Sequence, residues 1–329
     1  MKQRKIPEPK PLFLERMQKL LTDKEDYQKY LDILKIQPVR SFRCNTLKIS
    51  PKDLKEKLKE KYNWKIIQPW KDYLEIMIVD SELEPGELGR ALEHLLGYYY
   101  IQELASCLPV IALKPKPHEK ILDLCSAPGS KTTQIASVVE NTGSIIANEV
   151  SLGRIKILSS NLERCGVTNT IITKKDGIAL CNKLKKEGFE FDKILVDAPC
   201  SGEGTLRSSL KTYSMWNPKT IKTLSRLQKN LFKSAFGVLK LDGEIVYSTC
   251  TYAPEENEEI VDWVLKEFGE QIKIEKISLP VKTREGIRKW EEKKYLEDVK
   301  YSCRVYPHDN NTEGFFLVKF RRIKKNTSD

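Results

Sequence analysis

The 329-residue chain has no long apolar run, although 40% of its residues are hydrophobic. A membrane-spanning helix needs about 20 consecutive apolar residues, so none is predicted. The basic start, MKQRKIPEPK, has no apolar segment behind it and does not follow the pattern of a secretory signal. We therefore expect a cytoplasmic protein with enough apolar residues for a sizeable core.

Metal-ligand patterns are also missing. The 8 cysteines form no CxxC pair, and the chain has only 3 histidines. Structural zinc sites bring Cys and His ligands together at such short spacings, so no metal site is predicted. Scattered cysteines are expected to be reduced thiols in apolar surroundings. Neither G-x-x-x-x-G-K-[ST] nor G-x-G-x-x-G occurs, which argues against the common phosphate-binding loops.

The chain has fewer acidic residues than basic residues. The chain has 57 Lys and Arg residues against 46 Asp and Glu, a net charge of +11 and a pI near 9.1. A basic balance favours a polyanionic partner, because lysines and arginines release counterions from phosphates. The alternative is a lysine-rich surface without a nucleic-acid partner. Abundant Lys and Glu together also suit a heat-adapted surface.

Four regions are predicted along the chain. Residues 1–38 are expected to form an N-terminal helical arm, helical over 11–34 and loose over the first ten residues. Residues 39–113 have strand character at 39–49, 64–70 and 73–80 and a helix at 51–62, which predicts a small α+β lobe with a bridge. Residues 114–322 are expected to form the catalytic domain, and 323–329 a tail.

Strands and helices alternate in the third region. Strands are predicted at 120–128, 143–150, 170–177, 191–199 and 243–251, and helices at 130–140, 152–166, 217–240 and 255–268. This alternation predicts an α/β domain with a parallel sheet and helices on both faces. Ligands of such sheets bind beyond the carboxyl ends of the strands, where the motifs below lie.

Three strand ends favour a nucleoside cofactor. The turn APGS (127–130) lets a ligand approach the backbone ahead of a helix N-terminus, or is a plain tight turn. Glu149 ends the next strand, where an acid accepts ribose hydroxyls, caps a helix or is solvated. Asp176 ends the third strand and either accepts from an adenine amino group or caps a turn. Without a phosphate-binding loop, S-adenosylmethionine fits better than NAD or ATP.

Two cysteines end the next two strands. Cys200 lies in VDAPCSG, which also holds Asp197, and Cys250 lies in STCT. A thiolate there can attack an electron-poor ring carbon, and Asp197 can hydrogen-bond the amidine edge of a base. Carbon 5 of a pyrimidine becomes nucleophilic once a thiolate adds at carbon 6, and a base must then remove the carbon-5 proton. Two cysteines can therefore share one methylation reaction.

The motifs together resemble those of the RNA cytosine-5 methyltransferases of the NOL1/NOP2/Sun (RsmB/RsmF-like) family. The resemblance spans about residues 39–321 and rests on RCNTLK, YYIQELASCLPV, DLCSAPGSKT, ANE, VDAPCSGEGTLR, YSTCTYAPEENE and RVYPHDNNTEGFFLVKF. It implies a Rossmann-like S-adenosylmethionine-dependent methyltransferase fold with a small α+β N-terminal RNA-binding lobe.

The resemblance also implies residue roles. Cys250 is expected to add to carbon 6, Cys200 to assist release by taking the carbon-5 proton, and Asp197 to hold the cytosine at N3 and N4. Lys131 is expected near the target base, Glu149 at the ribose and Asp176 at the adenine. The full set of expected cofactor-binding residues is Cys125, Ser126, Ala127, Pro128, Gly129, Lys131, Glu149, Arg154, Asp176 and Asp197.

RNA is the expected partner of a monomeric chain. A compact chain without a dedicated RNA-binding appendage suits a small folded substrate, and the composition suggests an archaeal-type tRNA enzyme. His308 is a second-tier candidate that is equally well explained as a hydrogen-bonded structural histidine. The residues expected to contact RNA are Arg43, Asn45, Arg207, Arg304 and His308.

Three alternatives to a tRNA enzyme stay open. Ribosomal RNA is the main one, since similar proteins with an N-terminal lobe also modify it. A non-catalytic RNA-binding or assembly factor on the same fold is disfavoured because Cys200, Cys250, Lys131 and Asp197 are all present. A DNA cytosine methyltransferase would use the Pro-Cys thiol as its nucleophile and would not need Cys250.

Overall fold

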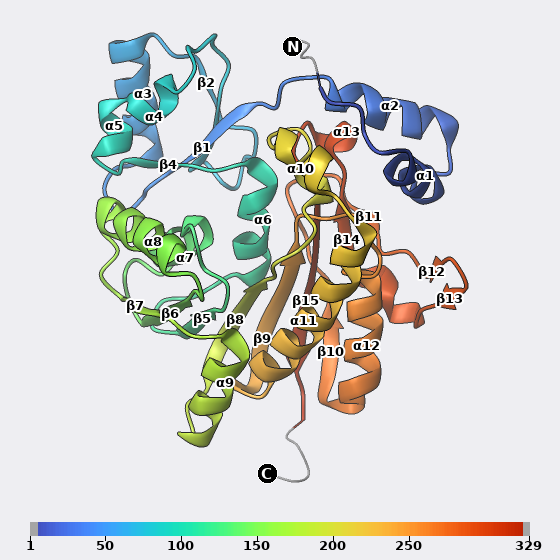
Figure 1. Cartoon of the computed structure of the whole chain (residues 1–329). Coiled ribbons are helices and arrows are strands. Elements are labelled where there is room, and N and C mark those ends of the chain that lie inside the picture. The colour runs from blue at the N-terminus through green and yellow to red at the C-terminus, as the bar shows by residue number, and fades with distance from the viewer. Residues whose placement is uncertain (1–5, 325–329) are drawn as a thin grey trace.

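The computed structural model describes residues 6–324, and a nine-stranded mixed sheet runs through the middle of this region (Figure 1). The strand order is β11-β14-β15-β9-β8-β5-β6-β7, and β10 pairs with β15. The bounds are β5 Lys120–Asp123, β6 Ser144–Asn148, β7 Thr170–Thr173, β8 Phe191–Asp197, β9 Leu239–Thr249, β10 Ile272–Glu275, β11 Arg284–Glu285, β14 Cys303–Val305 and β15 Phe315–Arg322.

The sheet is parallel in its first half and antiparallel in its second. Strands β5 to β9 are parallel, as the alternating sequence predicts. The C-terminal strands β10, β14 and β15 pair in antiparallel fashion, which extends the predicted sheet. Strand β5 has β6 on one side and β8 on the other, so the order in which strands are added to the sheet reverses between β5 and β8. That point is where ligands of open α/β sheets bind.

Helices cover both faces of the sheet. On one face lie α6 (Leu104–Leu113), α7 (Ser130–Val138) and α8 (Leu152–Cys165). On the other face, α9 (Gly177–Lys186), α11 (Pro218–Phe236) and α12 (Glu258–Phe268) pack against β8, β9 and β15. The predicted helices therefore form close to their expected bounds. Helix α9 was not predicted, because only Leu180 and Cys181 form its buried apolar contact.

The N-terminal lobe has its own four-stranded antiparallel sheet, of order β2-β3-β1-β4. Its elements are β1 Arg40–Cys44, α3 Pro51–Tyr62, β2 Ile66–Ile67, β3 Ile76–Val79, α4 Glu87–Arg90, α5 Leu92–Leu95 and β4 Tyr99–Ile101. Phe42, Leu54, Leu58 and Tyr99 belong to its buried core. Helix α6 follows the lobe but packs against the large sheet, so the domain division at residue 113 stays a proposal.

The predicted N-terminal helix is two helices, α1 (Pro11–Leu20) and α2 (Lys24–Leu34). The break occurs because the Asp23 side chain accepts from the Asp26 amide and caps α2. Both helices pack against the C-terminal half of the chain near α10 and α13 (Figure 1). Lys10, expected in a loose arm, donates to the carbonyls of Ser214 and Trp216. Residues 1–5 and 325–329 lie outside the described residues.

Ion pairs reinforce the packing of the arm. Arg16 of α1 makes a bidentate pair with Glu255, at 2.7 and 3.1 Å. Asp26 of α2 pairs with Arg284, at 2.5 and 2.6 Å, and contacts His308 at 3.0 Å. Planar guanidinium groups suit such two-point contacts with carboxylates. The arm is therefore attached next to the segment that follows Cys250.

Shorter elements complete the described chain: η1 Glu203–Thr205, α10 Leu210–Met215, η2 Gly269–Gln271, β12 Lys289–Trp290, β13 Lys293–Lys294, η3 Glu297–Tyr301 and α13 Pro307–Asn310. Between residues 6 and 324, no helix has the length and apolar character needed to cross a bilayer. The same residues hold no cluster of three metal-ligating side chains.

Removal of the buried Glu258 carboxylate should destabilise the fold strongly. Arg304 of β14 donates to both oxygens of Glu258, at 2.5 and 2.6 Å, and both side chains are buried. Glu258→Gln leaves a buried cation without its counter-ion, so we expect a loss of about 3 kcal/mol in the free energy of unfolding, measured by urea titration. Glu297→Gln, which breaks an exposed pair with Arg288, is the control and should leave the midpoint unchanged. Equal effects of the two substitutions would contradict a structural role for the buried pair.

Candidate active site

The predicted site residues meet at one edge of the sheet. Cys125 follows β5, Glu149 follows β6, Asp176 follows β7, Cys200 follows β8 and Cys250 follows β9. Parallel strands place their carboxyl ends at the same edge, and this edge includes the point where the strand order reverses. In the register of β8 with β9, Asp197 lies opposite Ser248. The two cysteines therefore leave neighbouring strands at nearly the same level.

The two thiols are in contact. The Sγ atoms of Cys200 and Cys250 lie 3.3 Å apart, and both cysteines are free thiols. The hydrogen bond with Cys250 raises the pKa of the Cys200 thiol most, and burial raises it further, as do the charges of Cys250 and Glu256. Cys200 therefore favours its protonated thiol form.

Lys131 and Asp197 form an ion pair beside the thiols. Lys131 Nζ lies 2.7 Å from Asp197 Oδ2 and 3.1 Å from Ser106 Oγ. Asp197 Oδ1 accepts from Ser248 Oγ at 2.7 Å. Burial opposes the charge on Lys131, but the pKa of Lys131 is raised, because Asp197, Asp123 and the charge of Cys250 outweigh burial.

Asp197 is the accessible member of this ion pair. Its side chain is 25% exposed, against 10% for Lys131. Deeper in the fold, Asp123 accepts from Thr132 Oγ1 at 2.7 Å, and burial raises its pKa to about 7. Asp123 is the first residue of the DLCSAPGSKT motif, but no role was predicted for it. An accessible carboxylate beside two thiols is what a bound base edge needs.

A cavity of about 90 Å³ lies on the other side of the reversal point. Glu149, Arg154 and Asp176 line it, together with Leu124, Cys125, Asn148, Val150, Lys175, Gly177, Pro199, Leu227 and Leu231. The Glu149 carboxylate accepts from the Ser151 amide at 2.9 Å and pairs with Arg154 at 2.8 Å. Arg154 is half exposed and also donates to the Ala127 carbonyl.

The lining of the cavity carries acceptor groups of the kind that a nucleoside requires. Glu149 is buried, yet it binds only one backbone amide and one half-exposed arginine, so ribose hydroxyls can replace the arginine contact. Asp176 Oδ1 caps α9 by accepting from the Ile178 and Ala179 amides, as the alternative reading predicted, and the residue also lines the cavity. The predicted cofactor residues on this side thus surround one space, whereas their roles stay proposals.

The glycine turn follows Cys125, but neither Ser126 nor Gly129 lines the cavity. Ser126 donates twice to the Asn148 carbonyl, from its amide and from Oγ, both at 2.9 Å. Gly129 has φ +105°, and a Cβ there would lie 3.0 Å from the Leu158 side chain, so the turn requires glycine. Ala127 and Pro128 complete the turn and do not line the cavity themselves. Lys131 lies on the thiol side.

Two predicted RNA contacts on the lobe need correction. Arg43 is buried and donates to the Ser130 carbonyl at 2.9 Å, to Thr133 Oγ1 at 2.8 Å and to Gln102. Asn45 is buried and donates to the carbonyls of Gly97 and Cys165, at 2.8 and 2.7 Å. Because these bonds lie inside the protein, the two side chains join the lobe to the catalytic domain and do not face RNA.

The other three predicted RNA contacts need the same correction. Arg207 is buried and donates to the Thr312 carbonyl and to Asn311 Oδ1, both at 2.8 Å. Arg304 is held by Glu258. The His308 side chain is 3% exposed and contacts Asp26, so His308 is the hydrogen-bonded structural histidine that was the alternative prediction. These three residues stabilise the C-terminal strands and the arm.

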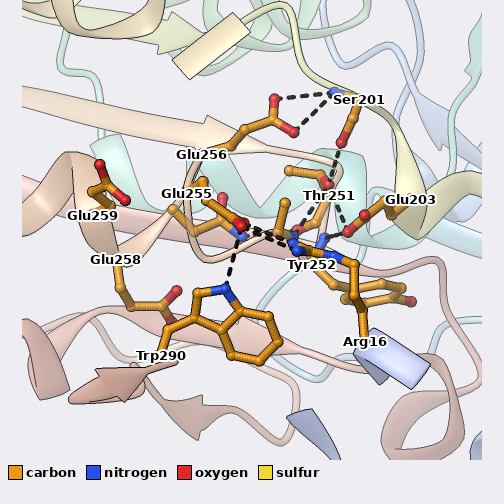
Figure 2. Close-up of polar contacts among 12 residues, drawn as sticks. Arg16, Ser201, Glu203, Thr251, Tyr252, Glu255, Glu256, Glu258, Glu259 and Trp290 are labelled. Carbon is orange, nitrogen blue, oxygen red and sulfur yellow. Dashed lines mark hydrogen bonds and ion pairs between the residues drawn. The ribbon is translucent and has the colours of Figure 1, made fainter. Parts of the chain in front are cut away.

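Acidic residues flanking the cysteines were missed. Figure 2 shows Glu203 and Glu256 beside Ser201, Thr251 and Tyr252, while Glu255 bonds Arg16 and Trp290. A signal was present in the sequence, since GEG follows Cys200 and PEENE follows Cys250, both close to apolar strands. Acidic residues next to buried strands indicate buried carboxylates with specific partners.

Two protein-family models match the chain. Residues 9–104 match the N-terminal domain of 16S rRNA methyltransferase RsmF, and residues 110–321 match 16S rRNA methyltransferase RsmB/F. The tRNA (cytosine(49)-C(5))-methyltransferase of Pyrococcus abyssi is 41% identical over 94% of this chain and 95% of its own length. Ribosomal RNA small subunit methyltransferase F of Erwinia tasmaniensis is 38% identical over 95% of this chain. The chain spans only 63% of that second protein.

Solved structures agree with this assignment. A methyltransferase homolog from Pyrococcus horikoshii has 32% identity and a TM-score of 0.77, covering 95% of this chain and 100% of that one. NSun6 from Pyrococcus horikoshii, solved with the S-adenosylmethionine analogue SFG, has 26% identity and a TM-score of 0.78. That match covers 96% of this chain and 99% of the other.

Cys250 should be the most reactive cysteine among the described residues. A thiol reacts with iodoacetamide far more slowly than a thiolate. Contact with Cys250 and burial raise the pKa of Cys200, and burial raises the pKa of Cys44, Cys107, Cys125, Cys165, Cys181 and Cys303. We expect peptide mass spectrometry after brief alkylation of the folded protein to find Cys250 labelled first. Cys200→Ala should leave Cys250 as the first cysteine to be labelled. Preferential labelling of Cys200 in the wild-type protein would contradict the assignment.

Proposed function

The chain belongs to the RsmB/F family of methyltransferases, and we propose that it methylates carbon 5 of a cytosine in tRNA with S-adenosylmethionine as methyl donor. The contact between the Cys200 and Cys250 thiols carries this proposal. Cytosine carbon 5 needs a nucleophile at carbon 6 before it can accept a methyl group, and a base afterwards. Two adjacent thiols supply both groups.

Cys250 is the proposed nucleophile. Its thiolate forms a bond to carbon 6, and the electron pair of the C5–C6 double bond moves towards carbon 5. Lys131 lies on this side of the pair and stabilises the negative charge before attack. S-adenosylmethionine, when bound, supplies a methyl group on a sulfonium sulfur. Carbon 5 takes that methyl group with the electron pair it has gained.

Asp197 is proposed to hold the cytosine. Its carboxylate accepts from the exocyclic N4 amine and favours a proton on N3, which makes carbon 6 more electrophilic. Ser248 and Lys131 fix the orientation of this carboxylate through contacts of 2.7 Å each. The target base has to leave its stack to reach this position, as in other enzymes that modify bases.

Cys200 is proposed to complete the reaction as a base. While Cys250 is a thiolate, the hydrogen bond between the sulfurs keeps Cys200 protonated. Once Cys250 is bonded to carbon 6, it is a neutral thioether and this effect ends, so Cys200 can release its proton to solvent. The Cys200 thiolate then takes the carbon-5 proton. The C5–H electrons reform the double bond, and Cys250 leaves as a thiolate, which restores the starting state with one proton released.

The cofactor is proposed to lie in the cavity at the ends of β5, β6 and β7. Glu149 would accept the ribose hydroxyls and Asp176 the adenine amino group, with Cys125 and the glycine turn around the methionine end. Arg154 would move from Glu149 to a cofactor contact. The cavity and the thiols flank Pro199 and the end of β8, so the methyl group can be directed at the base held by Asp197.

The preference for tRNA rests on full-length similarity. The tRNA methyltransferase of Pyrococcus abyssi matches over nearly the whole length of both chains. Relatives named ribosomal RNA small subunit methyltransferase F are similar in identity, but the chain spans 63% or 64% of the first two. Ribosomal RNA is therefore the second candidate substrate. A monomeric state, a cytoplasmic location and an RNA-binding role for the N-terminal lobe complete the proposal.

Bisulfite sequencing tests the substrate. Purified tRNA and rRNA transcripts are incubated with the protein and S-adenosylmethionine, and methylated cytosines are then protected from conversion. We expect one protected cytosine in tRNA and none without the cofactor. Protection in rRNA alone would identify rRNA as the substrate and would still support methylation of cytosine at carbon 5. No protection in either RNA, with S-adenosylmethionine shown to bind, would contradict the proposed activity.

Replacement of each cysteine should block a different step of the reaction. Cys250→Ala is expected to abolish turnover and any covalent adduct, since the proposed nucleophile is removed. Cys200→Ala is expected to accumulate a protein–RNA adduct, visible as a slower band on a denaturing gel, because the carbon-5 proton is not removed. Cys303→Ala, in β14 away from the site, is the control. An adduct in Cys250→Ala, or none in Cys200→Ala, would contradict these roles.

A further inference from the structure

A buried carboxylate holds the backbone around Cys200. Glu256 belongs to the segment after Cys250, and its oxygens accept from the Ser201 amide at 3.1 and 3.3 Å. Gln228 Nε2 donates to Glu256 at 2.8 Å and to the Pro199 carbonyl at 2.9 Å. The residues before and after Cys200 are therefore both tied to Glu256, directly or through Gln228.

A second buried carboxylate holds the backbone after Cys250. Glu203 belongs to the loop that carries Cys200, and its oxygens accept from Thr251 Oγ1 at 3.1 Å and from the Tyr252 amide at 3.2 Å. Trp216 Nε1 donates to the same carboxylate at 2.7 Å. The next residue, Gly204, donates its amide to the carbonyl of Cys250 at 2.9 Å.

The two contacts are reciprocal, as Figure 2 shows for Glu203, Glu256, Ser201 and Thr251. Each cysteine-bearing segment sends one carboxylate to the backbone that follows the other cysteine. The hydroxyls of Ser201 and Thr251 also meet, at 2.7 Å. Loss of donors to a buried carboxylate is costly, and separation of the segments would remove the contacts of Glu203 with Thr251 and Tyr252 and those of Glu256 with Ser201. We call this pair the carboxylate clamp.

We propose that the carboxylate clamp positions the two thiols, with Glu203 acting on Cys250 and Glu256 acting on Cys200. This inference rests on the proposed two-thiol reaction and names residues that do not touch the substrate. It has a specific consequence. Because the thiols act in different steps, loss of Glu203 should impair attack on carbon 6, whereas loss of Glu256 should impair release of the adduct.

The substitutions follow from the contacts. In Glu203→Gln, one amide group must face either Trp216 or Tyr252, which are both donors, so Cys250 loses part of its support. Glu256→Leu leaves the Ser201 amide without this acceptor and leaves Gln228 Nε2 with the Pro199 carbonyl. Glu256→Gln retains one acceptor oxygen and is the conservative rescue variant. Glu259→Gln, whose carboxylate contacts Lys229 and Lys293 and neither cysteine segment, is the control.

The first readout separates the two catalytic steps. Rapid-quench gels with labelled tRNA transcript measure how fast the adduct forms and how fast it disappears. Glu203→Gln should form adduct at least about tenfold more slowly, as expected for a misplaced nucleophile. Glu256→Leu should form it at the normal rate and resolve it about tenfold more slowly, with partial recovery in Glu256→Gln. KM for RNA should stay constant. Equal slowing of both steps in both variants would overturn the inference.

The second readout does not depend on methylation. Diamide takes two electrons and two protons from a pair of adjacent thiols and leaves a disulfide, so its rate reports how often the sulfurs meet. The Cys200–Cys250 disulfide, detected by peptide mapping without RNA, should form several-fold more slowly in Glu203→Gln and in Glu256→Leu than in the wild type or Glu259→Gln. Gln228→Met, which removes the Pro199 contact and keeps Glu256, should slow it as well.

These outcomes distinguish the positioning role of the carboxylate clamp from the proposed methylation reaction. Wild-type rates of disulfide formation in both clamp variants would overturn the inference even if methylation is confirmed. Slower disulfide formation in the variants would support positioning even if the wild-type protein forms no RNA adduct, which would instead count against the proposed function. Thermal unfolding of every variant identifies those that are not folded, and Gln228→Met replaces any that fail.

Discussion

The contact of 3.3 Å between the Cys200 and Cys250 sulfurs is the constraint on which the rest of the site depends. Two chemically identical side chains can play different roles only if their surroundings differ. Lys131 and Asp197 lie on one side of the pair, and the pKa of Cys200 is raised by Cys250, burial and Glu256 on the other. In the proposed reaction, this difference separates the nucleophile Cys250 from the later base Cys200.

The fold supplies this contact through strand register and buried carboxylates. Parallel pairing of β8 with β9 puts Asp197 opposite Ser248, so that both cysteines follow at the same edge. Beyond the strands the backbone is irregular, and Glu203 and Glu256 hold it there. The neighbouring Glu255 and Glu258 bind Arg16 of the arm and Arg304 of β14. Four carboxylates close to the cysteines thus connect the thiol pair to distant parts of the chain.

The sheet and the thiol pair could be predicted from the sequence because they follow from local patterns. Apolar strands alternate with helices, and each motif lies where a strand ends, so the neighbourhood of Cys200, Cys250 and Asp197 follows from topology. Helix α9 and the break between α1 and α2 could not be predicted as easily. The first has a weak apolar stripe, and the second depends on one capping aspartate.

The predicted RNA contacts were wrong for a physical reason. An arginine in a basic chain suggests phosphate binding, yet Arg43, Arg207 and Arg304 are buried. Their partners include Gln102, Thr312 and Glu258, which lie 59, 105 and 46 residues away in the sequence. Nothing local distinguishes a buried arginine from an exposed one. The roles of Glu203 and Glu256 were not predicted for the same reason, because each has partners in the other cysteine segment, far away in the sequence.

The most direct test of the two-thiol account identifies the sulfur that bonds to the base. A tRNA transcript containing 5-fluorocytidine is incubated with the protein and S-adenosylmethionine, because fluorine at carbon 5 cannot leave as a proton and the adduct persists. After digestion, mass spectrometry finds the peptide that carries the nucleotide. The account predicts attachment to Cys250 alone. Attachment to Cys200 would contradict it.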